Sequence, residues 1–502
     1  MAANAIPEFE NTRRPLFLAS YDAGATSRRT RGWNAPTTSP NALLGNLATL
    51  RDRSRAARRN DGYAKGVIDK LVSNIIGTGI TPLSQADDVG FRKQVQTLWL
   101  KWTDQSDADG MLDWFGQQTQ AVRAWLEGGE ALVRMRDRLP SDGLVVPLQL
   151  QVLEPELCPH SYNNSAIPGG NKIRAGIEFN GIGRRVAYWF HPSRPGDYED
   201  FDSSQLRRVP ADRVTHLFDP ERPGQLRGVP FLTPVLIKLH ELDKFDDATL
   251  LRQQLANLFV GFVERPAPVD DETTTHPLTG LTAPTGDLPE LALEPGIFQE
   301  LAPGEKVTFS NPPGNASGYG DFMRQQLAAV ASATGVPYEV ITGDMKGVSD
   351  RTLRVILHEF RRRIQAWQHQ IVAFQFCRPI WRAWFDRAVL SGALRVPAAY
   401  YTDPEPWTRV KWMPQGWPYL HPVQDVDAQK AAIRAGFTSR SAVVSEQGED
   451  AAAIDEEQAA DNARADGLDL RYDSDGRRPA NGAIGPEPNA DPDPADPAPT
   501  EP

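Results

Sequence analysis

Few side chains in this sequence have the types and spacing needed for catalytic chemistry. His358 and Glu359 stand in "HEFRR", which has the start of a zinc-binding helix, but residue 362 is arginine where a second histidine would be needed. The carboxylates of "ELDKFDD" (241–247) fall on a predicted helix, where a solvated or inter-subunit face is favoured over a catalytic pair. These patterns predict no catalytic residues.

Patterns that bind phosphates or metals are missing too. The sequence has no G-x-x-x-x-G-K-[ST] loop and no G-x-S-x-G elbow, and "GTG" (77–79) is too short for a dinucleotide fingerprint. The 8 histidines are scattered, and Cys158 lies far from Cys377 in the chain, which argues against a metal cluster. We therefore predict no metal, no cofactor and no enzymatic activity.

The candidate that remains is a loop, "GVPYEVITGDMKGVSDRTLR" (335–354), between two predicted helices. Gly335 and Pro337 close the first helix and form a predicted hinge at the joint. Ser349 is the predicted N-cap of the second helix, with Asp350 in its first turn. Its candidate site residues are Lys346 and the neighbouring Gly343, Asp344, Met345 and Gly347.

Length and composition limit the class of protein. At 502 residues the chain is too long for one ordinary core, and its 40% hydrophobic and 24% charged residues are typical of soluble globular proteins. No apolar run could span a bilayer, and the N-terminus lacks a signal core. Two cysteines suggest a reducing compartment. The net charge of −11 argues against a protein that clamps nucleic acid over a broad surface, but not against one that lets DNA pass.

The first half of the chain predicts a mixed α+β domain after an extended arm (1–40). Helical spacing covers 43–80, 89–104 and 114–130, and strands are predicted at 130–136, 146–157 and 212–218, with a hairpin at 173–190. In that hairpin Ile173, Ala175, Ile177 and Phe179 alternate as one strand. A basic face, solvated or contacting another subunit, is formed by Arg51, Arg53, Arg55, Arg58 and Arg59.

Long helices dominate the second half. One is predicted from Thr233 as N-cap to about 259, one at 319–334, and one at about 350–390, which would extend roughly 60 Å with a kink at Pro379. Residues 263–315 between the first two break the helical pattern, with short strand-like runs such as "IFQELA" (297–302) and "KVTFS" (306–310). The apolar stripe of 350–390 repeats every seven residues, in one series of Leu357, Ile364 and Ile371 and a second of Phe360, Trp367, Phe374 and Trp381. A single chain offers too few predicted neighbours to cover this stripe, so we expect an oligomer.

The C-terminal part has a Pro/Trp-rich connector (403–422), a short helical segment to about 467, and an acidic, proline-rich tail. Within the helical segment we predict a helix, a glycine stop, a serine cap and a second helix. From about 473 onward the tail has almost no large apolar side chains, so it is predicted to be disordered.

With these elements in order, several strings make the chain resemble the portal proteins of tailed bacteriophages, specifically the lambda-type family. These are "RRNDGYAKGVIDKLVSNIIGTGI" (58–80), "EGGEALVRM" (127–135), "LQLQVLEPELC" (148–158), "GIEFNGIGRRVAYWFHPSRPGD" (176–197), "VPADRVTHLFDPERPGQLRGVPFL" (209–232), "LAPGEKVTFSNP" (301–312) and "ATGVPYEVITGD" (333–344). The tract "VSDRTLR" (348–354) departs from the family pattern.

The resemblance implies an α+β portal fold: a mixed wing, a two-helix stem, an irregular β-containing clip, a long wing-crossing helix and a helical crown, assembled as a ring. The implied regions are an N-terminal arm (1–40), wing (41–222), first stem helix (223–262), clip (263–315), second stem helix (316–335), channel loop (336–350), long wing helix (351–392), connector and crown (393–470) and tail (471–502).

The resemblance also implies the partners and the place of action. These are a homo-oligomeric ring of twelve subunits at a capsid vertex, double-stranded DNA passing through its channel, the large terminase that drives packaging, a head-tail adaptor, and the major capsid and scaffold proteins. In such a ring the loop 335–350 would project into the channel, where Gly343, Asp344, Met345, Lys346 and Gly347 would face the DNA; the alternative for this loop is an ordinary helix–helix connector. No membrane partner is expected. The chain would reside in the virion, and in the host cytoplasm during assembly. The alternative is a phage-encoded assembly enzyme, such as a maturation protease or a packaging nuclease.

Overall fold

The computed structural model describes residues 38–167, 169–195, 205–257, 261–264, 273–275, 282–284, 306–309, 318–419, 421–472 and 475–477. The predicted N-terminal arm lies almost wholly outside these residues. Of the predicted tail, only 471–472 and 475–477 are described, and there Arg477 forms an ion pair with Asp466 at 2.9 Å. Among the described helices, none is long and apolar enough to cross a membrane.

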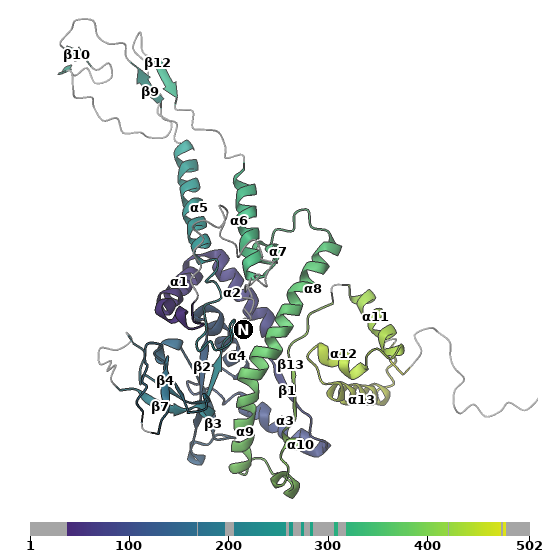
Figure 1. Ribbon diagram of the computed structural model, residues 1–502. Helices are drawn as coiled ribbons and strands as arrows, with labels where there is room; N and C mark the ends of the chain where they lie inside the picture. Colours follow the sequence, from purple (N-terminus) through teal and green to yellow (C-terminus); the bar gives the residue numbers. More distant parts are fainter. Residues whose placement is uncertain are drawn as a thin grey trace, which may run out of the picture.

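The N-terminal body extends from η2 to β8 (Ala42–Leu217), and we call it the wing. It combines helices with small antiparallel sheets (Figure 1). Its helices are η2 (Ala42–Asn46), α1 (Leu47–Asn60), α2 (Gly62–Ile75), α3 (Val89–Thr103), α4 (Trp114–Gly128), and the 3-10 turns η3 (Pro140–Asp142), η4 (Pro155–Leu157) and η5 (Ala211–Arg213). The predicted helix 43–80 is thus interrupted. Asp61 breaks it because its carboxylate accepts the N–H groups of Tyr63 and Ala64, which makes it the N-cap of α2.

Two sheets in the wing have the strand orders β3-β2-β8 and β4-β5-β6-β7. The strands are β2 (Ala131–Asp137), β3 (Leu148–Leu153), β4 (Lys172–Arg174), β5 (Ile177–Phe179), β6 (Arg185–Phe190), β7 (Arg207–Pro210) and β8 (Val214–Leu217). A separate pair joins β1 (Thr81–Ser84) to β13 (Val410–Met413), so the chain returns to the wing long after leaving it.

The single strand predicted over 173–179 is wrong. Ala175 (φ 52°) and Gly176 (φ 78°) both adopt positive φ, and Arg174 faces Ile177, so a two-residue turn divides the run into β4 and β5. The glycine is required, because a Cβ at Gly176 would lie 2.8 Å from both the Cys158 Sγ and the Pro159 carbonyl oxygen.

The predicted basic face on α1 is also corrected. Arg51 is fully buried, and the Arg55 guanidinium binds both oxygens of Glu156 at 2.8 and 2.9 Å. Arg58 binds Asp69 at 3.0 Å. Only Arg53 and Arg59 of the five are exposed. Most of these arginines therefore hold the wing together.

The predicted helix at 350–390 is confirmed as one run: α8 (Asp350–Trp367), a π-helical stretch η6 (Gln368–Cys377) and α9 (Arg378–Leu390). The wider π turns come just before Pro379, where an ordinary helix would place the proline ring against the carbonyl of Gln375. They also change the helical phase, and Phe374, expected in the apolar stripe, is 59% exposed.

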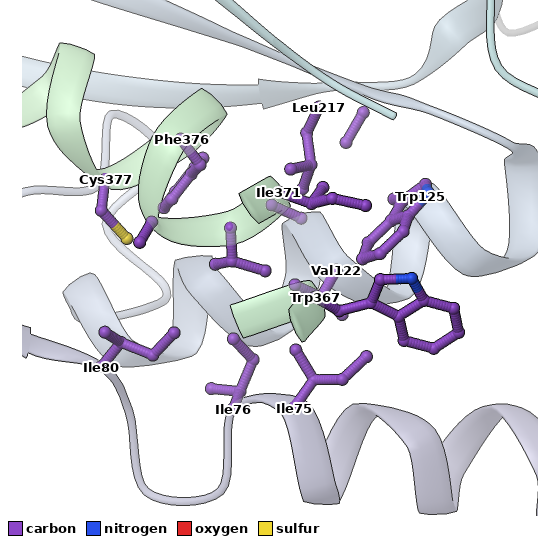
Figure 2. Close-up of a cluster of buried hydrophobic side chains, with 14 of the residues drawn as sticks. Ile75, Ile76, Ile80, Val122, Trp125, Leu217, Trp367, Ile371, Phe376 and Cys377 are labelled. Atoms are coloured by element: carbon purple, nitrogen blue, oxygen red, sulfur yellow. The ribbon is translucent and has the colours of Figure 1, made fainter. Parts of the chain in front are cut away.

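Most of that apolar stripe is buried within this single chain. The stripe therefore gives no reason to infer an oligomer, because helices of the same chain cover it. Figure 2 shows Trp367, Ile371 and Phe376 packed against residues of α2 and α4. An aromatic cluster from α3, α4 and α9 extends this core, and its indole rings are those of Trp99, Trp102, Trp114, Trp381 and Trp384.

Two helices project from the wing side by side (Figure 1). They are α5 (Leu236–Asn257) and α6 (Tyr319–Thr334). The predicted N-cap Thr233 instead donates its hydroxyl to the Pro230 carbonyl at 2.7 Å, and the helix begins three residues later. Leu242 packs with Met323 and Leu327, and the ring of Phe245 lies 4.8 Å from that of Phe322. These contacts join the two helices near the wing.

Beyond α5 and α6 the described residues form two strand pairs. Antiparallel β9 (Gly261–Glu264) pairs with β12 (Lys306–Phe309), and β10 (Thr273–Thr275) pairs with β11 (Thr282–Pro284). The strand expected at 306–310 is confirmed in β12. The strand-like run "IFQELA" (297–302) and most of the predicted clip lie outside the described residues.

The C-terminal part returns to the wing and then leaves it. It comprises η7 (Ala398–Tyr401), α10 (Glu405–Thr408), β13, and the helices α11 (Pro422–Arg434), α12 (Arg440–Glu446) and α13 (Ala451–Gly467). The predicted serine cap is confirmed, because Ser439 accepts the Ala442 N–H at 3.1 Å. Within α11–α13 only Ala451 is buried, so this helical group has almost no core of its own.

Candidate functional site: the α6–α8 connection

The joint after α6 is confirmed at Gly335, which adopts φ +65° and donates its N–H to the Ala331 carbonyl at 2.7 Å. A Cβ there would lie 1.8 Å from Nη1 of Arg363 on α8. That same Nη1 donates to the Thr334 carbonyl at 2.7 Å and so caps the end of α6. Glycine is needed here both for the backbone conformation and for the approach of α8.

Arg363 makes this joint a packed contact. Its guanidinium lies 4.5 Å from the ring centre of Trp367 and 5.7 Å from that of Phe231. Burial lowers the pKa of Arg363. A movement of the connection at Gly335 would therefore have to displace a stacked, hydrogen-bonded guanidinium, which limits how freely the predicted hinge can act.

A short helix that the sequence did not predict follows the joint. Pro337 precedes α7 (Tyr338–Thr342), which ends at Gly343 with φ +73°. Val336 and Ile341 are buried, so the first half of the connection is anchored to the wing. Five residues are too few to produce a helical periodicity that could be recognised in the sequence.

The remaining residues, 343–349, form the exposed loop between α7 and α8. Asp344 shapes it: its carboxylate accepts the Lys346 N–H at 3.0 Å and the Tyr338 hydroxyl at 3.3 Å. Gly347 supplies a second positive φ of 77°. Met345 and Lys346 are exposed, and the Lys346 ammonium has no hydrogen-bond or ion-pair partner among the residues that the structure describes.

Other cations lie near this loop and were missed in the sequence. Arg351 and Arg354 stand in the first turns of α8, and Arg324 of α6 lies over the ring of Tyr338 at 5.7 Å. Asp350 could offset them, but it binds His421 at 2.7 Å. Ser349 caps α8 as predicted, accepting the Thr352 N–H at 3.2 Å. The available signal was three cations within nine residues, 346–354.

The candidate catalytic patterns are not assembled into a site. His358 and Glu359 are both exposed on α8, and Glu359 lies 3.6 Å from Arg362. In the "ELDKFDD" segment, Glu241 binds Lys244 at 3.1 Å, and Asp246 accepts the hydroxyl of Tyr319, whose pKa is raised to about 12 by this bond. Within the described part of the chain, no group of three or more His, Cys, Asp or Glu is arranged to hold a metal ion.

Glu130 forms a buried ionic centre with Arg51, Arg227 and His216. Glu130 binds Arg51 Nη2 at 2.6 Å, Arg227 Nε at 2.7 Å and His216 Nε2 at 2.8 Å. Although burial alone would raise the pKa of Glu130, the charges of Arg227 and Arg51 hold it well below its usual range. The centre joins α1, β8, the residue just before β2 and the segment that leads to α5.

Three members of this centre stand in two strings noted in the sequence: Glu130 in "EGGEALVRM", and His216 and Arg227 in "VPADRVTHLFDPERPGQLRGVPFL". Arg227 also donates to the carbonyls of Cys158 and Ala175, both at 2.9 Å. The sequence offered no signal for this, because the four charged partners are far apart in the chain and three of them stand in different predicted elements. The role is structural: it fixes the wing where α5 begins.

Wing stability is expected to fall on acidification. Burial lowers the pKa of His216 to about 4, whereas an exposed histidine has a pKa near 6.5, so between these values the unfolded chain binds more protons. The free energy of unfolding should drop by about 2 kcal/mol from pH 7 to pH 5. His216→Gln should make the free energy of unfolding less dependent on pH, and urea unfolding at pH 7 and pH 5 will measure this. An equally steep pH dependence in the variant would show that His216 is not the titrating group.

Comparisons with known proteins all point to the same family. The pattern of the phage portal protein, lambda family, matches residues 26–368. A probable portal protein of Halomonas phage phiHAP-1 is 26% identical over 478 residues, covering 89% of this chain and 87% of that protein. The portal protein of Escherichia phage N15 is 21% identical (85% and 86% covered), and portal protein B of Escherichia phage lambda is 20% identical (86% and 87% covered).

Among solved structures, the chain is similar to one from the neck of a native gene transfer agent (GTA) particle, computed with C12 symmetry. The sequence identity is 14% and the TM-score is 0.40, and the match covers 80% of this chain and 93% of that one. A chain from the virion of the native particle gives 13% identity and a TM-score of 0.42, with the same coverage. The family match spans well over half of the sequence and agrees with the strings that carry the resemblance. The chain belongs to the lambda family of phage portal proteins.

Proposed function

We propose that copies of this portal protein assemble into a ring, twelve subunits in the capsid, whose central channel carries double-stranded DNA. At one capsid vertex the ring would serve genome packaging, head-tail joining and DNA ejection. Family membership supports the portal role, and the observation that carries the channel is the α5/α6 pair with the α7–α8 loop at its base (Figure 1). Electron microscopy of the purified protein tests the ring.

The α5/α6 pair suits the stem of such a ring. The two helices are antiparallel and extend away from the wing. Apolar packing joins them, and so does a hydrogen bond from Tyr319, the first residue of α6, to Asp246 in the middle of α5. Three large apolar side chains of α5 are exposed in the single chain, those of Ile237, Leu250 and Leu251. Neighbouring subunits in a ring would cover such a surface.

The region boundaries follow the same proposal. The wing would be 41–222, the stem helices 223–262 and 316–335, the clip 263–315, the channel loop 336–350, the long wing helix 351–392, and the connector and crown 393–470. The near absence of buried residues in α11–α13 supports a crown that is completed by neighbouring subunits.

We infer that the α7–α8 loop faces the channel and that Lys346 meets DNA phosphates there. The lysine is exposed and unpartnered among the described residues, whereas the whole chain has a net charge of −11. A channel that passes a genome needs few persistent phosphate contacts, because each adds affinity through counterion release. A sparse positive ring on an acidic protein meets that need.

Lys346→Ala is expected to change the amount of DNA packaged or retained per particle while ring assembly stays normal, since the exposed ammonium has no hydrogen-bond or ion-pair partner among the described residues. Bulk DNA affinity should be weak and fall steeply with salt. DNA per particle is the measurement, with size-exclusion chromatography to check assembly. Lys101→Ala, which removes an exposed cation on α3, is the matched control; equal packaging in both variants and wild type would make Lys346 a bystander.

The remaining partners belong to the same proposal. The clip would dock the large terminase during packaging and the head-tail adaptor afterwards, and the wing would face the major capsid and scaffold proteins. No catalytic step and no cofactor is assigned, and the protein would act in the virion after assembly in the host cytoplasm. Replacing 263–315 by a short Gly/Ser turn should leave rings intact and abolish terminase binding; retained binding would place the dock elsewhere.

A further inference from the structure

A groove between α2 and α4 gathers positive charge on this acidic chain. It has a volume of about 780 Å³, and its polar lining consists of Arg58, Lys65, Asp69, Ser73, Thr119 and Arg123. None of these residues belongs to the α6–α8 connection or to the buried ionic centre. The groove therefore has no role in the portal account given so far.

Helical spacing explains why these side chains meet. Lys65, Asp69 and Ser73 are four residues apart on α2 and share one face. Thr119 and Arg123 are likewise four apart on α4, which packs against α2. Arg58 reaches the groove from the last turn of α1. Three helices thus contribute charge from three directions.

The charges within the groove are only partly neutralised. Arg58 binds Asp69 at 3.0 Å and lies 3.6 Å from Glu127. In contrast, the Lys65 ammonium and the Arg123 guanidinium have no hydrogen-bond or ion-pair partner anywhere in the described part of the chain. Two unpaired cations in one concave surface attract an anion more strongly than either would on a flat surface.

Two guanidinium nitrogens in this lining are buried without an acceptor. The Nε atoms of Arg58 and Arg123 are both shielded from solvent and find no hydrogen-bond partner among the described residues. Buried N–H groups in native proteins are normally satisfied, and those that are not call for a specific reason. A bound oxyanion at this position would provide one.

The hydroxyl groups of the groove indicate what kind of ligand fits. Ser73 Oγ already donates to the Asp69 carbonyl at 2.7 Å, and Thr119 Oγ1 donates to the Phe115 carbonyl at 3.2 Å. The donors left for a ligand are therefore on the cationic side chains. This favours an anion over a neutral polar molecule.

We propose that the α2–α4 groove is a phosphate-binding site. A tetrahedral phosphate accepts hydrogen bonds from several directions, which matches cations on three helices, whereas a planar carboxylate is best met by a single guanidinium fork. The volume is sufficient for a ligand of nucleotide size. The phosphate belongs either to a small free ligand or to a nucleic-acid backbone, and the proposal does not depend on ring assembly.

Titration calorimetry of the full-length protein with sodium pyrophosphate at low salt tests the site. The double variant Lys65→Gln/Arg123→Gln should bind about tenfold more weakly or worse, because each lost charge removes a charge-assisted hydrogen bond. Arg53→Gln/Lys101→Gln removes two exposed cations outside the groove and should bind like wild type. Ser73→Glu, which places a carboxylate in the groove from an exposed position, should also abolish binding.

Circular dichroism will check that each variant is folded. Absence of pyrophosphate binding to the wild type, or equal weakening in the groove and control variants, would overturn the proposal. Competition by a short DNA duplex then separates the two sources. Displacement of pyrophosphate assigns the site to nucleic-acid backbone, and failure to displace it assigns the site to a small phosphate ligand.

Discussion

Glu130→Gln is expected to lower the free energy of unfolding by about 3–5 kcal/mol, because it leaves two buried arginines facing a neutral side chain. Arg51, Arg227 and Glu130 are all essentially unexposed, so water cannot replace the lost carboxylate. Glutamine keeps the shape of glutamate, which confines the effect to charge and hydrogen bonding. Chemical denaturation followed by far-UV circular dichroism is the measurement.

A matched control for that substitution is Glu405→Gln. Glu405 also binds an arginine, Arg409, at 2.6 Å, but on the surface, where 64% of its side chain is exposed. Exposed ion pairs contribute little to stability because water and salt screen them, so the control should unfold close to the wild type. If Glu130→Gln behaved like the control, the buried ionic centre would not be what fixes the wing.

Trp99→Ala should destabilise the wing by a comparable amount, about 3–5 kcal/mol. The Trp99 ring is fully buried, and four other indole rings lie 4.9 to 5.4 Å from it. Two of them, Trp381 and Trp384, belong to α9, so the cavity would loosen the contact between the long helix and α3. The urea midpoint of unfolding reports the change.

The control for the aromatic cluster is Tyr401→Ala, since that ring is 73% exposed and its loss creates no cavity. A small effect of Trp99→Ala, near that of Tyr401→Ala, would mean that the neighbouring rings close over the gap. That result would also show that α9 is held to the wing mainly by other contacts.

Helices were the most predictable part of the fold. The bounds 319–334 and the stop at Gly335 could be recognised because a periodic apolar face ends at a glycine followed by a proline. The break at Asp61 was missed because apolar spacing continues through it, although aspartate followed by glycine is also a common capping sequence. Alternation of apolar residues in 173–179 could not distinguish one strand from two with a tight turn.

The candidate site was predictable only where its signal is local. Lys346 is recognisable as a lone cation beside glycines, and the structure places it in an exposed loop. Arg351 and Arg354 were overlooked because they belong to the helix that follows. The ionic centre at Glu130 depends on residues far apart in the sequence, so only the tertiary fold brings them together.

The oligomer inferred from the long helix illustrates a further limit. A heptad-like stripe shows that an apolar face must be covered, but not whether the cover comes from the same chain or from another. Here α2, α3 and α4 cover most of it. The ring now rests on family membership, on the exposed apolar residues of α5, and on the almost coreless group α11–α13.

The most direct test of the ring is negative-stain electron microscopy of the purified full-length protein, with its mass in solution measured on the same sample. The account predicts annular particles with a central channel and a mass above half a megadalton, as expected for twelve copies of a 55.5 kDa chain. A folded, stable monomer at every concentration tested, or a compact particle without a central opening, would contradict it.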